Sequence, residues 1–272
     1  MTHLNTHSSC IVSQVHIPEY DVQGSLHYTD KKKLVEFGIR HLRAFNPNAY
    51  IIITGHGYKP SNLSLADFYY WNDVHEPLNE HGYVINMPAQ YKYVYEGLAH
   101  AQSKGFTNVL KTRGDCIIGH RNITDYCDSF MNGKKLLITQ QTGPERMGDC
   151  FMYGSTDLLC KIWHKDNYAF HSDGLQNTAH HYRRAVEDLH GDWKAVLLKH
   201  CVLKDVDRLL FTCLRWNYYA LNELSMDMQK EMLSNSFLFT KYHWGLSNGW
   251  IKFDANRKMI GTDKLSYCER CI

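Results

Sequence analysis

The chain has 272 residues, of which 44% are hydrophobic, so it can bury a full core without staples. Its formal net charge of +2 gives no reason to expect nucleic acid or an acidic membrane surface as a partner. No apolar run approaches the roughly 18 residues that span a bilayer. The nine Cys are scattered, and the polar start, Met1–Ser9, is unlike a signal peptide. We therefore expect a soluble, cytoplasmic protein with reduced thiols and no membrane span.

Strands and helices are expected to alternate along the first 160 residues. Short β-branched, apolar or aromatic runs predict strands, and apolar positions at helical spacing predict two helices between them. The strands are expected at 10–17, 50–54, 68–71, 108–111, 136–139 and 150–153, and the helices at 30–45 and 90–104. Gly55-His56-Gly57 is expected to end the second strand. Residues 182–232 are predicted to be mostly helical, and 236–264 to hold short strands, including 237–239 and 250–253.

This alternation predicts an α/β fold with a mostly parallel central sheet and helices on both faces. No repeat, linker or boundary is evident, so 1–272 is expected to form one domain with a helical and short-strand C-terminal extension. Ligands of such sheets bind beyond the carboxyl ends of the strands. The segments Thr54-Gly55, Asn72-Asp73 and Arg113-Gly114-Asp115 follow three expected strands.

The segment Lys111-Thr112-Arg113-Gly114-Asp115 carries the charges that a nucleotide-sugar site requires. Lys111, Arg113 and Asp115 alternate along an extended segment and can share one face. Two cations would stabilise a leaving diphosphate, and the carboxylate would hold Mn²⁺ or Mg²⁺. Gly114 would let the backbone approach a ligand closely. The alternative is a surface turn with an ion pair.

Six segments in order, from Ser9 to about Trp163, resemble the WavE-type glycosyltransferases of lipopolysaccharide synthesis, and more broadly glycosyltransferases of the GT-A fold. The segments are 11–14, 45–54, 72–77, 86–101, 111–115 and 149–163. The resemblance implies a GT-A-like, Rossmann-like nucleotide-diphospho-sugar transferase fold. It also implies a nucleotide-sugar-binding half at 9–120 and an acceptor-side half at 121–272.

The chain departs from the family pattern at two places in this stretch. Gly114 stands where the family has Ser or Thr, and Pro88 or Ala89 stands where it has Arg. In addition, Arg113 replaces the first acid of the common Asp-x-Asp signature. Asp115 is therefore the one strong metal ligand expected in this segment, and Arg113 could supply part of the metal's charge.

The resemblance assigns nucleotide or donor binding to Ser13, Gln14, His16, Thr54 and Asp73, in addition to Lys111 and Arg113. Gln90, at an expected helix start, would donate to a phosphate or a sugar, helped by the helix N-terminus. The alternatives are a strand end that satisfies loop backbone for Ser13 and Gln14, and a helix-surface amide for Gln90.

A carboxylate must take the acceptor's proton if the enzyme inverts. The resemblance implies Asp149 as the first candidate, because it precedes an expected strand where the family has an acceptor-side acid. Glu187 is the second, although an ion pair with Arg183 or Arg184 on a solvated helix is its alternative. His243 lies in a segment that resembles an element with which some GT-A enzymes add an imidazole to the metal. A packed aromatic turn is the alternative for His243.

These residues predict a glycosyltransferase that moves a sugar from a nucleotide-diphosphate donor, UDP first, to a carbohydrate hydroxyl. The acceptor would be a bacterial surface polysaccharide, or a glycoprotein glycan such as a viral capsid glycan. One alternative is a nucleotidyltransferase, although no Gly-rich phosphate loop follows the first strand. Another is a carbohydrate-binding or capsid-associated module without nucleotide affinity.

Overall fold

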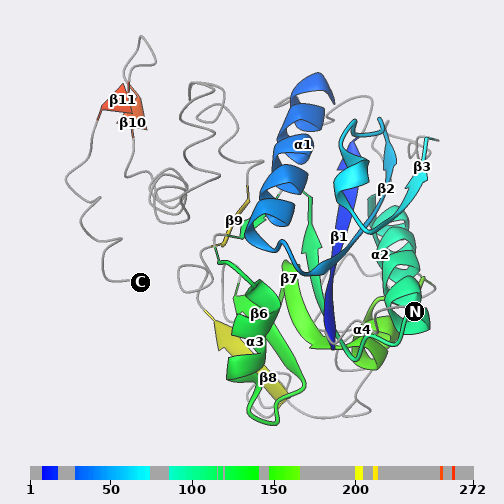
Figure 1. The fold of residues 1–272 in the computed structure, drawn as a ribbon, viewed down its shortest axis with the longest axis vertical. Helices are drawn as coiled ribbons and strands as arrows, with labels where there is room; N and C mark the ends of the chain where they lie inside the picture. Colours follow the sequence, from blue (N-terminus) through cyan, green and yellow to red (C-terminus); the bar gives the residue numbers. More distant parts are fainter. Residues whose placement is uncertain are drawn as a thin grey trace.

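The computed structural model describes residues 8–17, 28–73, 86–114, 116–118, 120–140, 147–165, 200–204, 211–213, 252–253 and 259–260. Its main feature is a seven-stranded sheet with the order β3-β2-β1-β4-β7-β6-β8 (Figure 1). Two further pairs of short strands lie outside this sheet, β5 with β9 and β10 with β11.

The first half of the chain builds a wholly parallel part of the sheet. Its strands are β1 (Ser9–Ile17), β2 (Tyr50–Gly57), β3 (Phe68–Asn72) and β4 (Asn108–Arg113). β1 pairs in parallel with both β2 and β4, and β2 pairs in parallel with β3. All four strands therefore end at one edge of the sheet, which we call the carboxyl edge.

The second half adds β6 (Leu136–Gln140), β7 (Met147–Ser155) and β8 (Cys201–Lys204). β7 runs antiparallel to both β4 and β6, whereas β8 is parallel to β6. Within this sheet β7 is thus the one reversed strand. The predicted α/β fold with a mostly parallel sheet is confirmed.

Helices cover both faces of the sheet, as predicted. α1 (Tyr28–Phe45) and α3 (Ile123–Met131) contribute to one apolar core, which includes Val15 and Leu110. α2 (Asn86–Ser103) and α4 (Thr156–Ile162) contribute to the other, which includes Val12 and Val109. Figure 1 shows α1 on one side of the sheet and α2 on the other. Among the helices of the described ranges, none is both long and apolar enough to cross a membrane.

Several boundaries differ from the prediction because pairing between strands overrides local signals. β2 continues through Gly55-His56-Gly57, which stay in register with β1, and β4 continues to Arg113. α2 begins at Asn86, four residues before the expected start. The short helices α3 and α4 were not predicted.

The region 182–232 was predicted to be mostly helical, and this is wrong for two of its segments. β8 pairs with β6, and β9 (Phe211–Cys213) pairs with β5 (Cys116–Ile118). Sheet edges far away in sequence thus decide their conformation. β10 (Lys252–Phe253) and β11 (Met259–Ile260) lie in or near the expected short strands, while the expected strand 237–239 lies outside the described residues.

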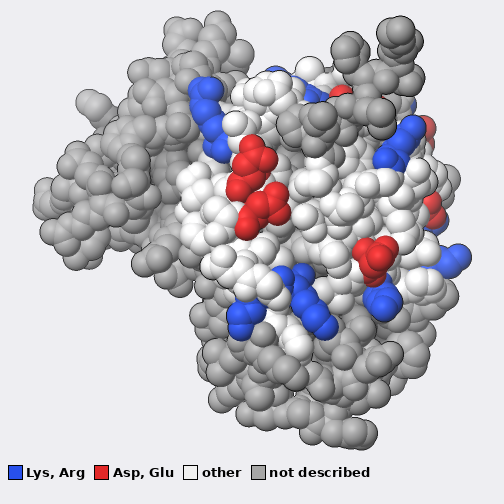
Figure 2. All heavy atoms as spheres, turned by 60° about the horizontal axis from the view of Figure 1, so that its bottom comes forward, with Lys and Arg blue, Asp and Glu red and all other residues white. Residues whose placement is uncertain are grey.

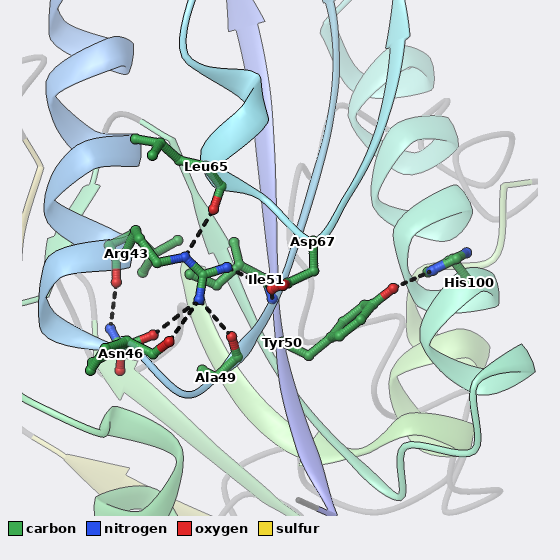
Figure 3. A network of polar contacts seen from close by, with 10 residues as sticks. Arg43, Asn46, Ala49, Tyr50, Ile51, Leu65, Asp67 and His100 are labelled. Atoms are coloured by element: carbon green, nitrogen blue, oxygen red, sulfur yellow. Dashed lines mark hydrogen bonds and ion pairs between the residues drawn. The ribbon is translucent and has the colours of Figure 1, made fainter. Parts of the chain in front are cut away.

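The Arg43 side chain joins the end of α1 to the connections around β2 and β3 (Figure 3). Its Nε donates to the Leu65 carbonyl at 2.9 Å, at the end of the short 3-10 helix η1 (Leu63–Leu65). Its guanidinium also donates to the Ala49 carbonyl at 2.9 Å and pairs with Asp67 at 2.6 Å. The same Asp67 oxygen accepts from the Ile51 backbone N–H at 2.8 Å. The amino ends of β2 and β3 are therefore tied to α1.

The face in Figure 2 shows the charges of the described residues without a field of one sign. Lys and Arg side chains lie beside Asp and Glu side chains on the white, described surface. This interspersed pattern fits the net charge of +2 for the whole sequence.

Candidate functional site

The side chains on the α2 face of the sheet change from apolar to polar at the carboxyl edge. Val12 of β1 and Ile52 of β2 are register partners and lie in the core. Because side chains alternate along a strand, the next partners on that face are Gln14 and Thr54, followed by His16 and His56. The neighbouring strands extend the two rows. We call the set the polar band, and it consists of Gln14, His16, Thr54, His56, Tyr70, Asn72 and Arg113.

Three aromatic rings are stacked across the polar band. The rings of His16 and His56 are 4.2 Å apart between centroids and 16° from parallel. The Tyr93 ring of α2 covers His56 at 4.8 Å and 17°. Asn72 donates to the Tyr93 hydroxyl at 3.0 Å, and Tyr70 lies against the same ring at 6.1 Å. The imidazole pair is therefore held in a fixed orientation by β3 and α2.

Helix α2 begins near the carboxyl edge and lies close to the sheet at Gly97. Tyr93 meets His56 near this edge, while His100, two turns later, meets Tyr50 at the opposite end of β2. A Cβ atom on Gly97 would lie 2.6 Å from Val12 Cγ1, so this glycine permits the close approach. The start of α2 thus lies beside the polar band.

Thr54 was expected to contact the nucleotide, but the structure gives its hydroxyl a structural role. Its Oγ1 donates to the Tyr93 carbonyl at 2.6 Å, and the residue is fully buried. The hydroxyl ties β2 to α2 and so fixes the position of the Tyr93 ring. The hydroxyl is buried beneath the helix in this structure, and a direct nucleotide contact by Thr54 stays a prediction.

Lys111 was expected to contact a diphosphate, but its side chain lies in the core between the sheet and α4. The residue is 0% exposed, and its Nζ lies 4.2 Å above the Trp163 ring. The Trp163 indole N–H donates to Met152 Sδ at 3.4 Å. A cation over an indole face is electrostatically favourable, and here it replaces contact with solvent. In this structure Lys111 thus serves packing and electrostatics in the core, and a contact with a diphosphate stays a prediction.

Arg113 ends β4 beside Gln14, its register partner on β1. The Arg113 side chain is half-buried, so it lies nearer the surface than Lys111 does. Gly114 continues the pairing, because its N–H donates to the Gln14 carbonyl at 2.9 Å. A Cβ on Gly114 would lie 2.5 Å from Val15 Cγ2. A side chain at position 114 would therefore collide with Val15.

Ser13 does not share a face with Gln14 and His16. It alternates with them along β1 and lies on the α1 face, between Ile11 and Val15 of the second core. Ser13 is 1% exposed. Its register partner on β4 is Thr112, whose Oγ1 is buried and has no hydrogen-bond partner among the described residues. The structure thus separates Ser13 from the other predicted nucleotide contacts.

Gln90 and Asp73 lie at the periphery of the polar band. Gln90 is half-buried in the second turn of α2, three residues before Tyr93. Asp73 is exposed and directly follows β3. Both positions lie near the carboxyl edge, as the sequence predicted, and their ligand roles stay predictions.

Asp149 belongs to β7 rather than preceding a strand. It stands two residues before Phe151, the register partner of Thr112 on β4. Because β7 and β4 are antiparallel, the Asp149 backbone lies at the carboxyl end of β4. The other three predicted acids and ligands, Asp115, Glu187 and His243, lie outside the described residues.

The described part of the site does not by itself make a metal centre. No group of three His, Cys, Asp or Glu side chains within the described ranges is arranged to hold a metal ion. The lone pairs of His16 and His56 lie in nearly parallel ring planes 4.2 Å apart, so they do not converge on one ion. The predicted metal would therefore depend on Asp115 and His243.

Cysteine chemistry is disfavoured at three positions that the structure describes. Burial raises the pKa of the Cys10 thiol, and burial followed by the nearby Asp128 raises that of Cys127. Burial, followed by the Asp157 charge, raises the pKa of Cys160 to about 11. These thiols stay protonated near neutral pH and are poor nucleophiles.

No family model and no curated protein sequence matches this chain. Solved structures do match it at low identity. A provisionally named nucleotide-diphospho-sugar transferase from Desulfovibrio desulfuricans matches with a TM-score of 0.45 and 11% identity, over 87% of this chain and 99% of that chain. A cytidylyltransferase from Leptospira borgpetersenii matches with a TM-score of 0.43 and 12% identity, over 86% and 97%.

A third solved structure is a glycosyltransferase involved in glycosylation of the major capsid of PBCV-1. It matches with a TM-score of 0.39 and 11% identity, over 73% of this chain and 83% of that chain. The names include both sugar transferases and a nucleotidyltransferase, so they do not choose between these activities. The resemblance to WavE-type enzymes stays a prediction.

The sequence reasoning missed His56 and Tyr93 as members of the site. His56 stood in a Gly-His-Gly segment that was expected to end β2. The available signal was that His16 and His56 each stand two residues after a polar residue at the end of an apolar strand. Tyr93 gave no such signal, because an aromatic residue at helical spacing is typical of a packed core.

Proposed function

We propose that the protein is a glycosyltransferase that uses a nucleotide-diphosphate sugar and binds it at the polar band. The observation that carries this proposal is the gathering of imidazole, amide and guanidinium groups at the carboxyl edge of parallel strands, beside the start of α2. Ligands of open α/β sheets bind at this edge. A diphosphate requires positive charge and hydrogen-bond donors, which these groups can offer.

Arg113, Gln14 and His16 are the donor-binding residues of the proposal. The guanidinium of Arg113 matches two phosphate oxygens at once, and Gln14 lies beside it on β1. Gln90 donates to a phosphate or to the sugar, and Asp73 accepts from the donor's hydroxyl groups. Lys111 and Thr54 support the site from below without touching the donor.

The proposed reaction breaks one bond and forms one. The bond between the anomeric carbon and the diphosphate oxygen breaks, and the nucleoside diphosphate leaves with both electrons. The acceptor's hydroxyl oxygen bonds to the same carbon, and its proton passes to a carboxylate. Asp149, whose backbone lies at the carboxyl end of β4, is the first candidate for this base in an inverting reaction, and Glu187 is the second.

A divalent cation, Mn²⁺ or Mg²⁺, would supply further neutralisation of the leaving diphosphate when bound. Asp115 would be its carboxylate ligand and His243 an imidazole ligand. UDP is the first candidate for the nucleotide. The acceptor would be a glycan or glycoprotein of a bacterial surface polysaccharide or a viral capsid, in the cytoplasm of the producing cell.

A thermal-shift screen with UDP, GDP, CDP, ADP and dTDP, each with and without Mn²⁺, tests the binding part of the proposal. A ligand that binds only the native state raises the melting temperature. We expect at least one nucleoside diphosphate to raise it. The matching nucleotide sugar should then be turned over to free nucleoside diphosphate.

The screen separates the two alternatives when nucleoside triphosphates with sugar phosphates, and glycans, are added to it. A nucleotidyltransferase would consume a nucleoside triphosphate with a sugar phosphate and release pyrophosphate. A carbohydrate-binding module would respond to glycans and to none of the nucleotides.

A further inference from the structure

The two imidazoles of the polar band differ in their exposure. His16 is partly exposed at the end of β1, whereas His56 is 1% exposed between the rings of His16 and Tyr93. A ligand at the carboxyl edge can therefore reach His16, while His56 stays behind it. The stack fixes the plane of the His16 ring and hence the direction of its ring nitrogens.

The pair can hold one proton readily but not two. Positive charges on rings 4.2 Å apart repel each other strongly when both are partly buried. Placing a charge on the enclosed ring of His56 would also cost desolvation. The exposed ring of His16 is therefore the less costly place for a proton.

A bound anion would favour protonation of the exposed ring of the pair. β1 contributes the uncharged Gln14 and β2 the uncharged Thr54 next to the pair. The titratable and charged described residues on the neighbouring elements include Tyr70 and Asp73 at the end of β3, Lys92, Tyr93 and Glu96 on α2, and Lys111 and Arg113 on β4. They carry both signs, and Lys111 lies in the core over Trp163. A phosphate dianion placed between Arg113 and His16 adds negative charge beside His16 and so favours its protonated form.

We propose that the His16–His56 pair is a proton-linked phosphate subsite, in which His16 takes up one proton as the diphosphate binds. His56 is the positioning residue that holds the His16 ring through the stack. This inference rests on the proposed function, because it takes the diphosphate of a nucleotide as the ligand. It adds that affinity for the donor increases as pH falls through the titration of the pair.

Proton uptake can be measured directly by titration calorimetry. The probe is the nucleoside diphosphate that gives the largest thermal shift in the screen above, titrated with Mg²⁺ into the whole chain. The titration is repeated near pH 7 in PIPES, HEPES and Tris, whose ionisation enthalpies differ. The slope of the observed enthalpy against the buffer's ionisation enthalpy gives the number of protons taken up.

Ring-preserving variants separate the two imidazoles and also correct for the nucleotide's own titration. His16→Phe keeps a ring against His56 but removes the proton acceptor. His56→Phe keeps the stack and leaves His16 able to titrate, whereas His56→Ala removes the support. His100→Gln is the matched control. The His100 ring is also stacked, with its centroid 3.6 Å from that of Phe68, but it lies at the opposite end of the sheet.

We expect His16→Phe to take up fewer protons on binding than the wild-type chain does, by up to one proton per nucleotide. His56→Phe and His100→Gln should take up as many protons as the wild-type chain. Binding to the wild-type chain should weaken by up to about tenfold per unit rise in pH across the titration, and His16→Phe should lose this dependence. His56→Ala should bind more weakly, and His56→Phe should restore the affinity.

Equal proton uptake by the wild-type chain and His16→Phe, with the nucleotide bound to both, would overturn the inference and leave the proposed function standing. If none of the nucleotides binds the wild-type chain at any pH, the proposed function fails and the inference with it.

Discussion

The two ends of the sheet use charged groups in different ways. At the amino ends of β2 and β3, Arg43 is enclosed by backbone carbonyls and pairs with Asp67 at 2.6 Å (Figure 3). At the carboxyl edge, the imidazoles of His16 and His56 are held by ring stacking instead. Stacking fixes both rings, of which the His16 ring is partly exposed and the His56 ring is buried.

The comparison separates charged groups that stabilise the fold from those that we assign to the proposed site. The Asp67 carboxylate has two internal partners, Arg43 and the Ile51 N–H, so it belongs to the folded structure. Lys111 falls in the same class, because its ammonium lies in the core over Trp163. Arg113, at the end of β4 beside Gln14, is assigned to the proposed site. Substitutions at the two ends should therefore change different measurements.

The largest effect is expected for Arg113→Met, which removes the guanidinium from the polar band. Affinity for the nucleoside diphosphate should fall by about a hundredfold, because a charged hydrogen-bond partner of phosphate contributes about 1.5–3 kcal/mol. The affinity of Arg113→Lys should lie between those of Arg113→Met and wild type, because lysine keeps the charge but cannot bind two phosphate oxygens at once. Calorimetric titration measures both constants.

Lys111→Met is the matched control for that comparison, since it removes a cation from the same face of β4. The nucleotide affinity of a folded Lys111→Met chain should stay within about threefold of wild type, because long-range electrostatics alone is screened. An equal loss of affinity in the two variants would contradict the assignment of Lys111 to the core.

Arg43→Met should lower the free energy of unfolding by about 1–2 kcal/mol, because several partly buried carbonyls and the half-exposed Asp67 lose their partner. Urea denaturation measures this change. Arg40→Met, an exposed arginine on the same helix, should cost no more than about 0.5 kcal/mol. Nucleotide affinity should be the same in both folded variants, and a selective loss in Arg43→Met would break the division between the two ends.

Gly97→Val should cost about 1–3 kcal/mol, because a Cβ there would lie 2.6 Å from Val12 Cγ1 and 3.1 Å from Thr54 Cγ2. Ala99→Val, half-exposed on the same helix, controls for the lower helix propensity of valine. Because Gly97 seats α2 and hence Tyr93, its variant should also weaken nucleotide binding. Unchanged affinity would show that the ring stack tolerates a displaced helix.

The smallest effect concerns His100, whose pKa is lowered by burial and then by Lys104. A lowered pKa means that the unfolded chain binds the proton more readily, so stability falls as pH drops through the unfolded value of about 6.5. His100→Gln should therefore lose slightly less stability than wild type between about pH 7.5 and 5.5. Urea denaturation at the two pH values checks the sign, and a larger loss in the variant would contradict it.

The sequence predicted the fold class well because strand and helix periodicity are local signals. The buried run Tyr50–Thr54 identifies β2, but only pairing with β1 shows that the strand continues to Gly57. β8 was missed for the same reason, because β6 determines its conformation from more than 60 residues away in the chain.

The sequence placed the candidate residues at the carboxyl ends of the strands, but it could not tell which of them share a face. Alternation along β1 puts Gln14 and His16 on one face and Ser13 on the other. The sequence alone could therefore have separated Ser13 from the other two residues. The depth of Lys111 could not be predicted, because it depends on Trp163, which reaches β4 only after the chain has folded. The stack of Tyr93 on His56 depends on the close approach of α2 at Gly97.

A crystal structure with a bound nucleoside diphosphate tests the central claim most directly. The account predicts that the phosphates lie at the carboxyl edge on the α2 face, within hydrogen-bonding distance of Arg113 and His16. A nucleotide bound on the α1 face beside Ser13, or away from the carboxyl edge altogether, would contradict it.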